Sequence, residues 1–118
     1  EFADGVVWAM AGARPNHNRV ALGILTALDT RLGTGRCEPF GSDQRVRLGD
    51  GAAYFYPDVS VACDARFDGD DCLLNPLVVL EVLSDSTEAI DRGRKWRHYA
   101  SAPSLRAYVL LSQDAHRA

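Results

Sequence analysis

The segment LVVLEVL at residues 77–83 constrains the fold of this 118-residue chain more than any other. A nearly continuous apolar strand of this kind is typical of the centre of a sheet that is covered on both faces. Its one charged residue is Glu81. Because an ionised carboxylate is costly to bury alone, Glu81 must be paired, protonated or bound to a cation. The alternative is a glutamate at the strand's end that reaches solvent or an arginine.

A helix is predicted before this strand, over residues 17–32. Asn16 is its expected N-cap, and Gly33 and Gly35 should end it. Apolar side chains recur at helical spacing and should form its buried stripe: Ala21, Leu25, Leu28 and Leu32.

Two strand patterns follow the first helix. Arg45–Leu48 alternates polar and apolar residues, and the Gly-Asp-Gly turn at 49–51 should begin a hairpin. Residues 54–63 read as one longer strand, in which Pro57 indicates an edge or a bulge near Asp58. The polar stretch at 64–71 reads as a solvated loop.

A second helix is predicted over residues 86–100, with Asp85 and Glu88 forming a start that resembles a capping box. One side of it should be lined by small and aromatic residues: Ala89, Gly93, Trp96 and Ala100. A last strand at 107–111 could lie parallel to its neighbour through a helical crossover. This order predicts an α/β fold in which helices flank a mixed central sheet, within one domain over residues 1–118.

Composition limits the possible functions. The apolar fraction of 47% and charged fraction of 25% are typical of a folded soluble protein. No apolar run long enough to span a membrane and no signal peptide is apparent, so we expect a cytoplasmic protein. The three cysteines form no C-x-x-C pair, which favours free thiols over a zinc site or a disulfide. The net charge of −3 weighs against a dedicated DNA binder but leaves room for an enzyme.

Three residues could form a chemical site: Asp58, Glu81 and Lys95. Two carboxylates can hold Mg²⁺ or Mn²⁺, and a nearby ammonium can orient a water or stabilise charge on a phosphate. This is the equipment for attack on a phosphodiester. Taken singly, Asp58 could be a turn residue after proline, and Lys95 could form an exposed ion pair with Asp91.

The chain resembles the Uma-two-type family of bacterial restriction-type endonucleases, which belongs to the PD-(D/E)xK nuclease superfamily. The resemblance covers essentially the whole chain, and the segment 84–95 is its most specific part. It rests on YPDVSV at 56–61, PLVVLEVLS at 76–84, STEAIDRGRK at 86–95 and PSLRAYVL at 103–110. Residues 7–12, SDQRV at 42–46 and the start of the first helix also look like the family.

The resemblance implies a restriction-endonuclease-like core with Mg²⁺, or Mn²⁺, as cofactor. Asp58 matches the motif aspartate and Glu81 the motif acid, and the carbonyl of Val82 would complete the metal ligands. The motif normally places a lysine two residues after the acid, where this chain has Leu83. The family resembles superfamily members whose lysine has moved to the following helix, and Lys95 is the match.

Other polar residues are secondary candidates. His17, Asp43 and Asp91 could form an outer layer of the site, although His17 could equally be a capping or surface residue. A basic stretch on the second helix could contact phosphates or could simply be a solvated face; its arginines are Arg92, Arg94 and Arg97. Family members usually continue past position 117, so the domain could be trimmed at both ends.

Three functions remain open from the sequence. The first is a metal-dependent endonuclease that hydrolyses phosphodiester bonds of DNA, acting as a dimer as many nucleases of this fold do. The second is a catalytically silent nuclease fold that serves as a DNA-binding or dimerisation module, which Leu83 and the negative net charge favour. The third is an interaction protein that has kept only the fold.

Overall fold

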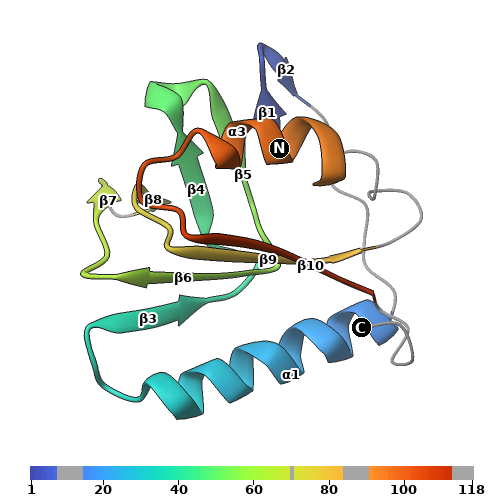
Figure 1. The fold of residues 1–118 in the computed structure, drawn as a ribbon, viewed down its shortest axis with the longest axis vertical. Coiled ribbons are helices and arrows are strands. Elements are labelled where there is room, and N and C mark those ends of the chain that lie inside the picture. The colour runs from blue at the N-terminus through green and yellow to red at the C-terminus, as the bar shows by residue number, and fades with distance from the viewer. Residues whose placement is uncertain (8–14, 70, 84–90, 113–118) are drawn as a thin grey trace.

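The computed structural model describes residues 1–7, 15–69, 71–83 and 91–112. In this part of the chain, a four-stranded sheet and a six-stranded sheet share one core, and helices lie on either side of the four-stranded sheet (Figure 1). The predicted class, an α/β fold with a mixed central sheet flanked by helices, is confirmed.

The four-stranded sheet is built around β9 (Val78–Leu83). On one side of β9 lies β10 (Ala107–Ser112), which runs parallel to it. On the other side lies β6 (Val59–Cys63), antiparallel, followed by β3 (Cys37–Phe40). The apolar run at 77–83 is therefore a central strand, and the predicted parallel position of the last strand is confirmed.

Helix α1 (Pro15–Leu32) lies along one side of this sheet (Figure 1). Its predicted extent is confirmed, but the helix begins at Pro15, so Asn16 lies within its first turn instead of capping it. The expected apolar stripe is half-buried, and no described residue of the helix is fully buried. Gly33 follows in a left-handed conformation (φ 58°), which glycine adopts without a steric penalty.

The predicted single strand at 54–63 is wrong, because the segment divides at Pro57 into strands of two different sheets. Strand β5 (Ala53–Phe55) belongs to the six-stranded sheet, and β6 belongs to the four-stranded one. Pro57 has no N–H to donate to a ladder. The N–H groups of Tyr56 and Asp58 donate instead to the side chains of Glu1 and Glu81. The irregularity expected near Asp58, an edge or a bulge of one strand, is instead a crossing between two sheets.

The six-stranded sheet contains several strands of two residues that the sequence did not reveal. Strand β4 (Arg45–Leu48) and β5 form the predicted hairpin through a 3₁₀ turn at Gly49–Gly51. Part of the expected solvated loop at 64–71 is a strand of this sheet. The four short strands are β1 (Phe2–Ala3), β2 (Val6–Val7), β7 (Phe67–Asp68) and β8 (Cys72–Leu73).

The second helical segment consists of a π-helical turn (Asp91–Lys95) that continues as α3 (Trp96–Ala100). The predicted start near residue 86, with its cap at Asp85 and Glu88, lies outside the described residues. The predicted inward side is wrong for the described positions, because Gly93, Trp96 and Ala100 are exposed. Lys95 and Tyr99, one helical turn apart, are buried instead, so the segment turns a different face to the core than the one predicted.

The core lies between the two sheets and α3. Its fully buried members include Phe55 and Leu73 of the six-stranded sheet, Val79 of β9 and Tyr99 of α3. The ring centroids of Phe55 and Tyr99 are 5.3 Å apart, within the range of a favourable aromatic pair. Both sheets and α3 are therefore held together by one apolar cluster.

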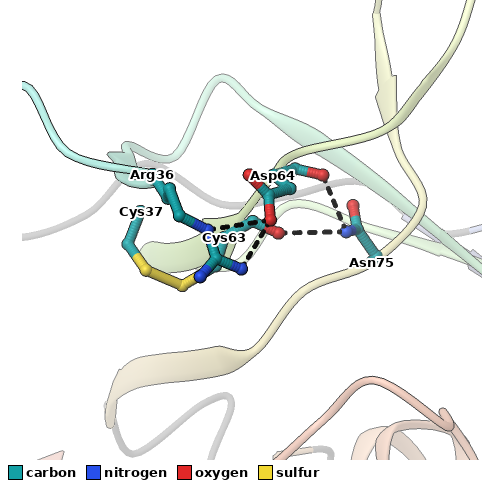
Figure 2. The surroundings of a disulfide bond; sticks show 5 residues. All are labelled: Arg36, Cys37, Cys63, Asp64 and Asn75. Carbon is teal, nitrogen blue, oxygen red and sulfur yellow. Dashed lines mark hydrogen bonds and ion pairs between the residues drawn. A yellow bond between two sulfur atoms is a disulfide. The ribbon is translucent and has the colours of Figure 1, made fainter.

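A disulfide joins β3 to β6 (Figure 2). Cys37 and Cys63 lie opposite each other in the antiparallel register and are bonded, so the expectation of three free thiols is wrong for this pair. Cys72 is free and buried. Arg36 donates two hydrogen bonds to the Asp64 carboxylate directly beside the disulfide.

Among the described helices, none combines the length and the apolar character needed to cross a membrane.

Candidate active site

The crossing from β5 to β6 places Asp58 against β9. The register pairs Val59 with Leu80, so Asp58 comes level with Glu81. The Asp58 amide donates to Glu81 Oε1 at 2.9 Å, and the Val82 amide donates to Asp58 Oδ2 at 2.7 Å. These reciprocal bonds hold both carboxylates next to each other at the point where the sheets separate.

Glu81 is 3% exposed, which excludes the alternative of a glutamate that reaches solvent. It shares a strand face with Val79, which packs in the core beside Tyr99. Its second oxygen, Oε2, accepts a hydrogen bond from Lys95 Nζ at 3.0 Å. The buried carboxylate is therefore paired on both oxygens, as the cost of burying charge requires.

Lys95 is 6% exposed, so the interpretation as a solvent-exposed ion pair is wrong. It lies one helical turn before Tyr99, and both side chains point into the core. Its Nζ is also 2.9 Å from Glu1 Oε1 and 5.5 Å from the ring centroid of Phe55. The ammonium thus lies between two carboxylates and above an aromatic face.

His17 approaches the same cluster from α1. Its Nε2 lies 3.2 Å from Asp58 Oδ2, and its side chain is 15% exposed. Its Nδ1 is buried without a hydrogen-bond partner among the described residues. The structure therefore places His17 beside Asp58 and largely away from solvent. The sequence carried a signal for this, because His17 continues the half-buried stripe through Ala21 and Leu25 by one helical turn.

Glu1 is part of the cluster, and sequence reasoning missed it. Its side chain is 5% exposed, its Oε1 contacts Lys95, and its Oε2 accepts the Tyr56 amide at 2.9 Å. It precedes β1, whose two residues carry no recognisable periodicity. Only the pairing of β1 with β5, which matches Phe2 with Tyr54, brings it to the site.

The remaining predicted residues differ in where the structure places them. Asp43 is exposed in the turn between β3 and β4. The side chains of Asp91 and Arg92 lie outside the described part of the structure. Arg94 is half-buried, and Arg97 is exposed on α3. Val82 contributes its amide to Asp58, so its backbone does lie at the site.

The donor set suits a hard divalent cation. Among the described side chains, Glu1, Asp58 and Glu81 bring three carboxylates to the neighbourhood of the Lys95 ammonium. Mg²⁺ prefers oxygen ligands and is commonly held by one or two carboxylates with several waters. Within the described ranges no group of three or more acidic, His or Cys side chains forms a ready-made metal cage. Asp58 and Glu81 fit the two-carboxylate case.

Comparison with known proteins places the chain in a family. A family model described as "Putative restriction endonuclease" (Uma2) matches residues 1–118. The chain belongs to the Uma2 family. It is 41% identical over 116 residues to an uncharacterized protein of Synechocystis sp. (strain ATCC 27184 / PCC 6803 / Kazusa), covering 98% of this chain and 61% of that protein. A second uncharacterized protein of the same strain is 35% identical over 120 residues, covering 99% of this chain and 68% of that protein.

A solved structure shares the architecture of this Uma2 protein. The crystal structure of "a putative nuclease belonging to DUF820" from Anabaena variabilis ATCC 29413 superposes with a TM-score of 0.75 and 14% sequence identity. The match covers 92% of this chain and 63% of that one. At this identity the likeness shows the fold alone. The chain spans about three fifths of the first Synechocystis relative and of the Anabaena structure.

Proposed function

We propose that this Uma2 protein is a Mg²⁺- or Mn²⁺-dependent endonuclease that hydrolyses phosphodiester bonds of DNA. The observation that carries the proposal is the convergence of Asp58, Glu81, Lys95 and His17 through direct contacts. They come from the β5–β6 crossing, β9, the π-helical turn and α1. Buried ionisable groups gathered from distant segments are costly to stability, and such clusters concentrate at functional sites.

In this proposal, Asp58, Glu81 and the Val82 carbonyl hold the cation. When bound, the cation would supply Lewis-acid chemistry and a water of lowered pKa. Lys95 carries a positive charge into a buried region, where it can orient a water or stabilise charge developing on a phosphate oxygen. His17 can hold Asp58 in place by a hydrogen bond from Nε2 to Oδ2. Its other ring nitrogen, Nδ1, has no hydrogen-bond partner among the described residues.

The leucine at position 83 agrees with the assignment of Lys95 as the lysine of the site. It occupies the position two residues after Glu81 where the superfamily motif has its lysine, and it is half-buried. Lys95 reaches Glu81 from the adjacent helical turn instead. The π-helical segment supplies the ammonium that the strand lacks.

The proposal is tested by cleavage of plasmid and single-stranded DNA during Mn²⁺ and Mg²⁺ titration. Strand β6 offers a matched pair of variants, because Asp58 precedes it within the site and Asp64 follows it in an exposed ion pair with Arg36. We expect Asp58→Asn and Glu81→Gln to abolish cleavage and weaken metal binding, and Asp64→Asn to change neither. Metal-dependent cleavage by the parent that survives both site variants would contradict the proposal.

A second candidate function is a silent nuclease fold that binds DNA or dimerises, which Leu83 at the usual lysine position favours. It predicts salt-sensitive DNA binding without cleavage at any metal concentration. Measurement of the molecular mass by analytical ultracentrifugation would decide between monomer and homodimer in either case. Fractionation of the source cells would test the expected cytoplasmic location.

A further inference from the structure

The Glu1 carboxylate has a position that the metal-site assignment does not explain. It is 5% exposed, and each of its oxygens has a separate contact. Oε1 lies 2.9 Å from Lys95 Nζ, and Oε2 accepts the Tyr56 amide at 2.9 Å. Burying this carboxylate is costly, so its contacts must return a comparable free energy.

Among the described residues, two carboxylates contact Lys95, and the proposed function gives one of them a second task. Glu81 Oε2 is 3.0 Å from Lys95 Nζ, yet Glu81 is also an assigned metal ligand. An ammonium buried to this degree needs an acceptor that does not depend on the metal. Glu1 is placed to be that acceptor, because its Oε1 contacts Lys95 while its Oε2 is held by the backbone.

Resting on the proposed function, we propose that Glu1 is a positioning residue that keeps the Lys95 ammonium at the site when Glu81 serves the metal. Its bond to the Tyr56 amide gives it a second role. Pro57 lacks an N–H, so Glu1 fixes the last backbone donor before Asp58. One carboxylate therefore sets the position of both the ammonium and the segment that carries the motif aspartate.

Two other roles for Glu1 lead to different measurements. As a metal ligand, its loss would weaken metal binding as strongly as the loss of Glu81. If Glu1 only neutralises charge in general, its loss would lower the free energy of unfolding without a specific effect on Lys95. A positioning residue instead affects how tightly the ammonium is held, and it affects turnover while metal affinity is preserved.

The sequence permits a direct measurement on the ammonium, because Lys95 is the only lysine. Protein labelled with ¹⁵N-lysine gives a single Nζ signal by NMR, and its hydrogen-exchange rate with water reports how firmly the ammonium is held. The metal-free variant Glu81→Gln mimics the state in which Glu81 is withdrawn. Because one glutamine oxygen cannot serve both the Asp58 amide and Lys95, Glu1 should then be the described carboxylate that still holds Lys95.

We expect slow exchange in the parent and in Glu81→Gln, and exchange about 10- to 100-fold faster in the double variant Glu1→Gln/Glu81→Gln. This is the effect of losing a hydrogen bond to a charged group. Fast exchange already in Glu81→Gln, or slow exchange in the double variant, would overturn the inference. Because neither arm needs metal or cleavage, the result stands apart from the proposed nuclease activity. Asp64→Asn is the control that should leave the signal unchanged.

A second measurement decides the question if the double variant does not fold. With parent protein that cleaves DNA, Glu1→Gln should lower kcat about 10- to 100-fold while Mn²⁺ affinity stays within about twofold of the parent. A fall in Mn²⁺ affinity equal to that of Glu81→Gln would instead make Glu1 a ligand and overturn the positioning role. If the parent does not cleave, Nζ exchange is compared between the parent and Glu1→Gln at saturating Mg²⁺, where Glu81 serves the metal, and an unchanged rate refutes the inference.

Discussion

Replacing Lys95 with methionine isolates the electrostatic contribution of the buried cluster. Methionine keeps an unbranched side chain of similar length and removes the charge that lies 5.5 Å from the centroid of the Phe55 ring. The change leaves Glu1 and Glu81 facing each other without their shared ammonium, at 5% and 3% side-chain exposure. Removing one partner of a buried ion pair typically costs about 3–5 kcal/mol, because the remaining charge is uncompensated.

The assay is equilibrium unfolding in urea, followed by circular dichroism. With a denaturant slope of about 2 kcal/mol per molar, a loss of about 4 kcal/mol lowers the midpoint by about 2 M. The matched control is Arg36→Met, which removes a cation from the Asp64 carboxylate at a position where both side chains are largely exposed. We expect a midpoint close to that of the parent for this control, because solvent screens exposed ion pairs.

A third variant tests the cause of the loss. The triple change Glu1→Gln/Glu81→Gln/Lys95→Met removes all three charges at once and should recover much of the lost stability, since neutral groups of similar size can replace a buried ion cluster at little cost. A Lys95→Met midpoint within about 0.5 M of the parent would refute the reasoning. So would a triple variant that is less stable than the single one.

Three further predictions concern the scaffold. Reducing the Cys37–Cys63 disulfide, which closes a separation of 26 residues, should lower the free energy of unfolding by about 3.5 kcal/mol, measured by urea unfolding with and without reductant in a Cys72→Ser background. Leu73→Ala at a fully buried position should cost about 2–5 kcal/mol, whereas Leu22→Ala on α1, 64% exposed, should leave the urea midpoint nearly unchanged. The Arg36 hydrogen bond holds the pKa of the Asp64 carboxyl below its ordinary value of 3.8, so the stabilisation that this pair provides is present above that value and lost as pH falls through the lowered pKa. Unfolding midpoints measured from pH 5 down to pH 2 should therefore fall less steeply in Asp64→Asn than in the parent.

The elements that the sequence predicted well are those with long, regular patterns. The helix at Pro15–Leu32 and the apolar strand at Val78–Leu83 each repeat one periodicity over several residues. The division of residues 54–63 could be anticipated only as an irregularity at Pro57. Which sheet each half joins depends on backbone donors that bind Glu1 and Glu81, and these contacts join residues far apart in the sequence.

Two predictions failed because each relied only on the pattern of neighbouring residues in the sequence. The cysteines offered no spacing motif, yet the β3–β6 register places Cys37 opposite Cys63. The inward side of the second helix was assigned to its small and aromatic residues, whereas the structure buries Lys95 and Tyr99, which lie one turn apart on another face. In both cases the deciding contacts are made with strands that lie far away in the sequence.

In the proposed site, the lysine and the carboxylates of the motif come from two different elements. A lysine two residues after Glu81 would share its strand face, and that face lies towards the core and α3. Lys95 enters the same space from the helical side and reaches Glu81 Oε2 at 3.0 Å. What the proposed chemistry requires is an ammonium beside the carboxylates, and either element can supply it. Leu83 then remains available for packing, while the helix-borne lysine requires its own acceptor, which Glu1 provides.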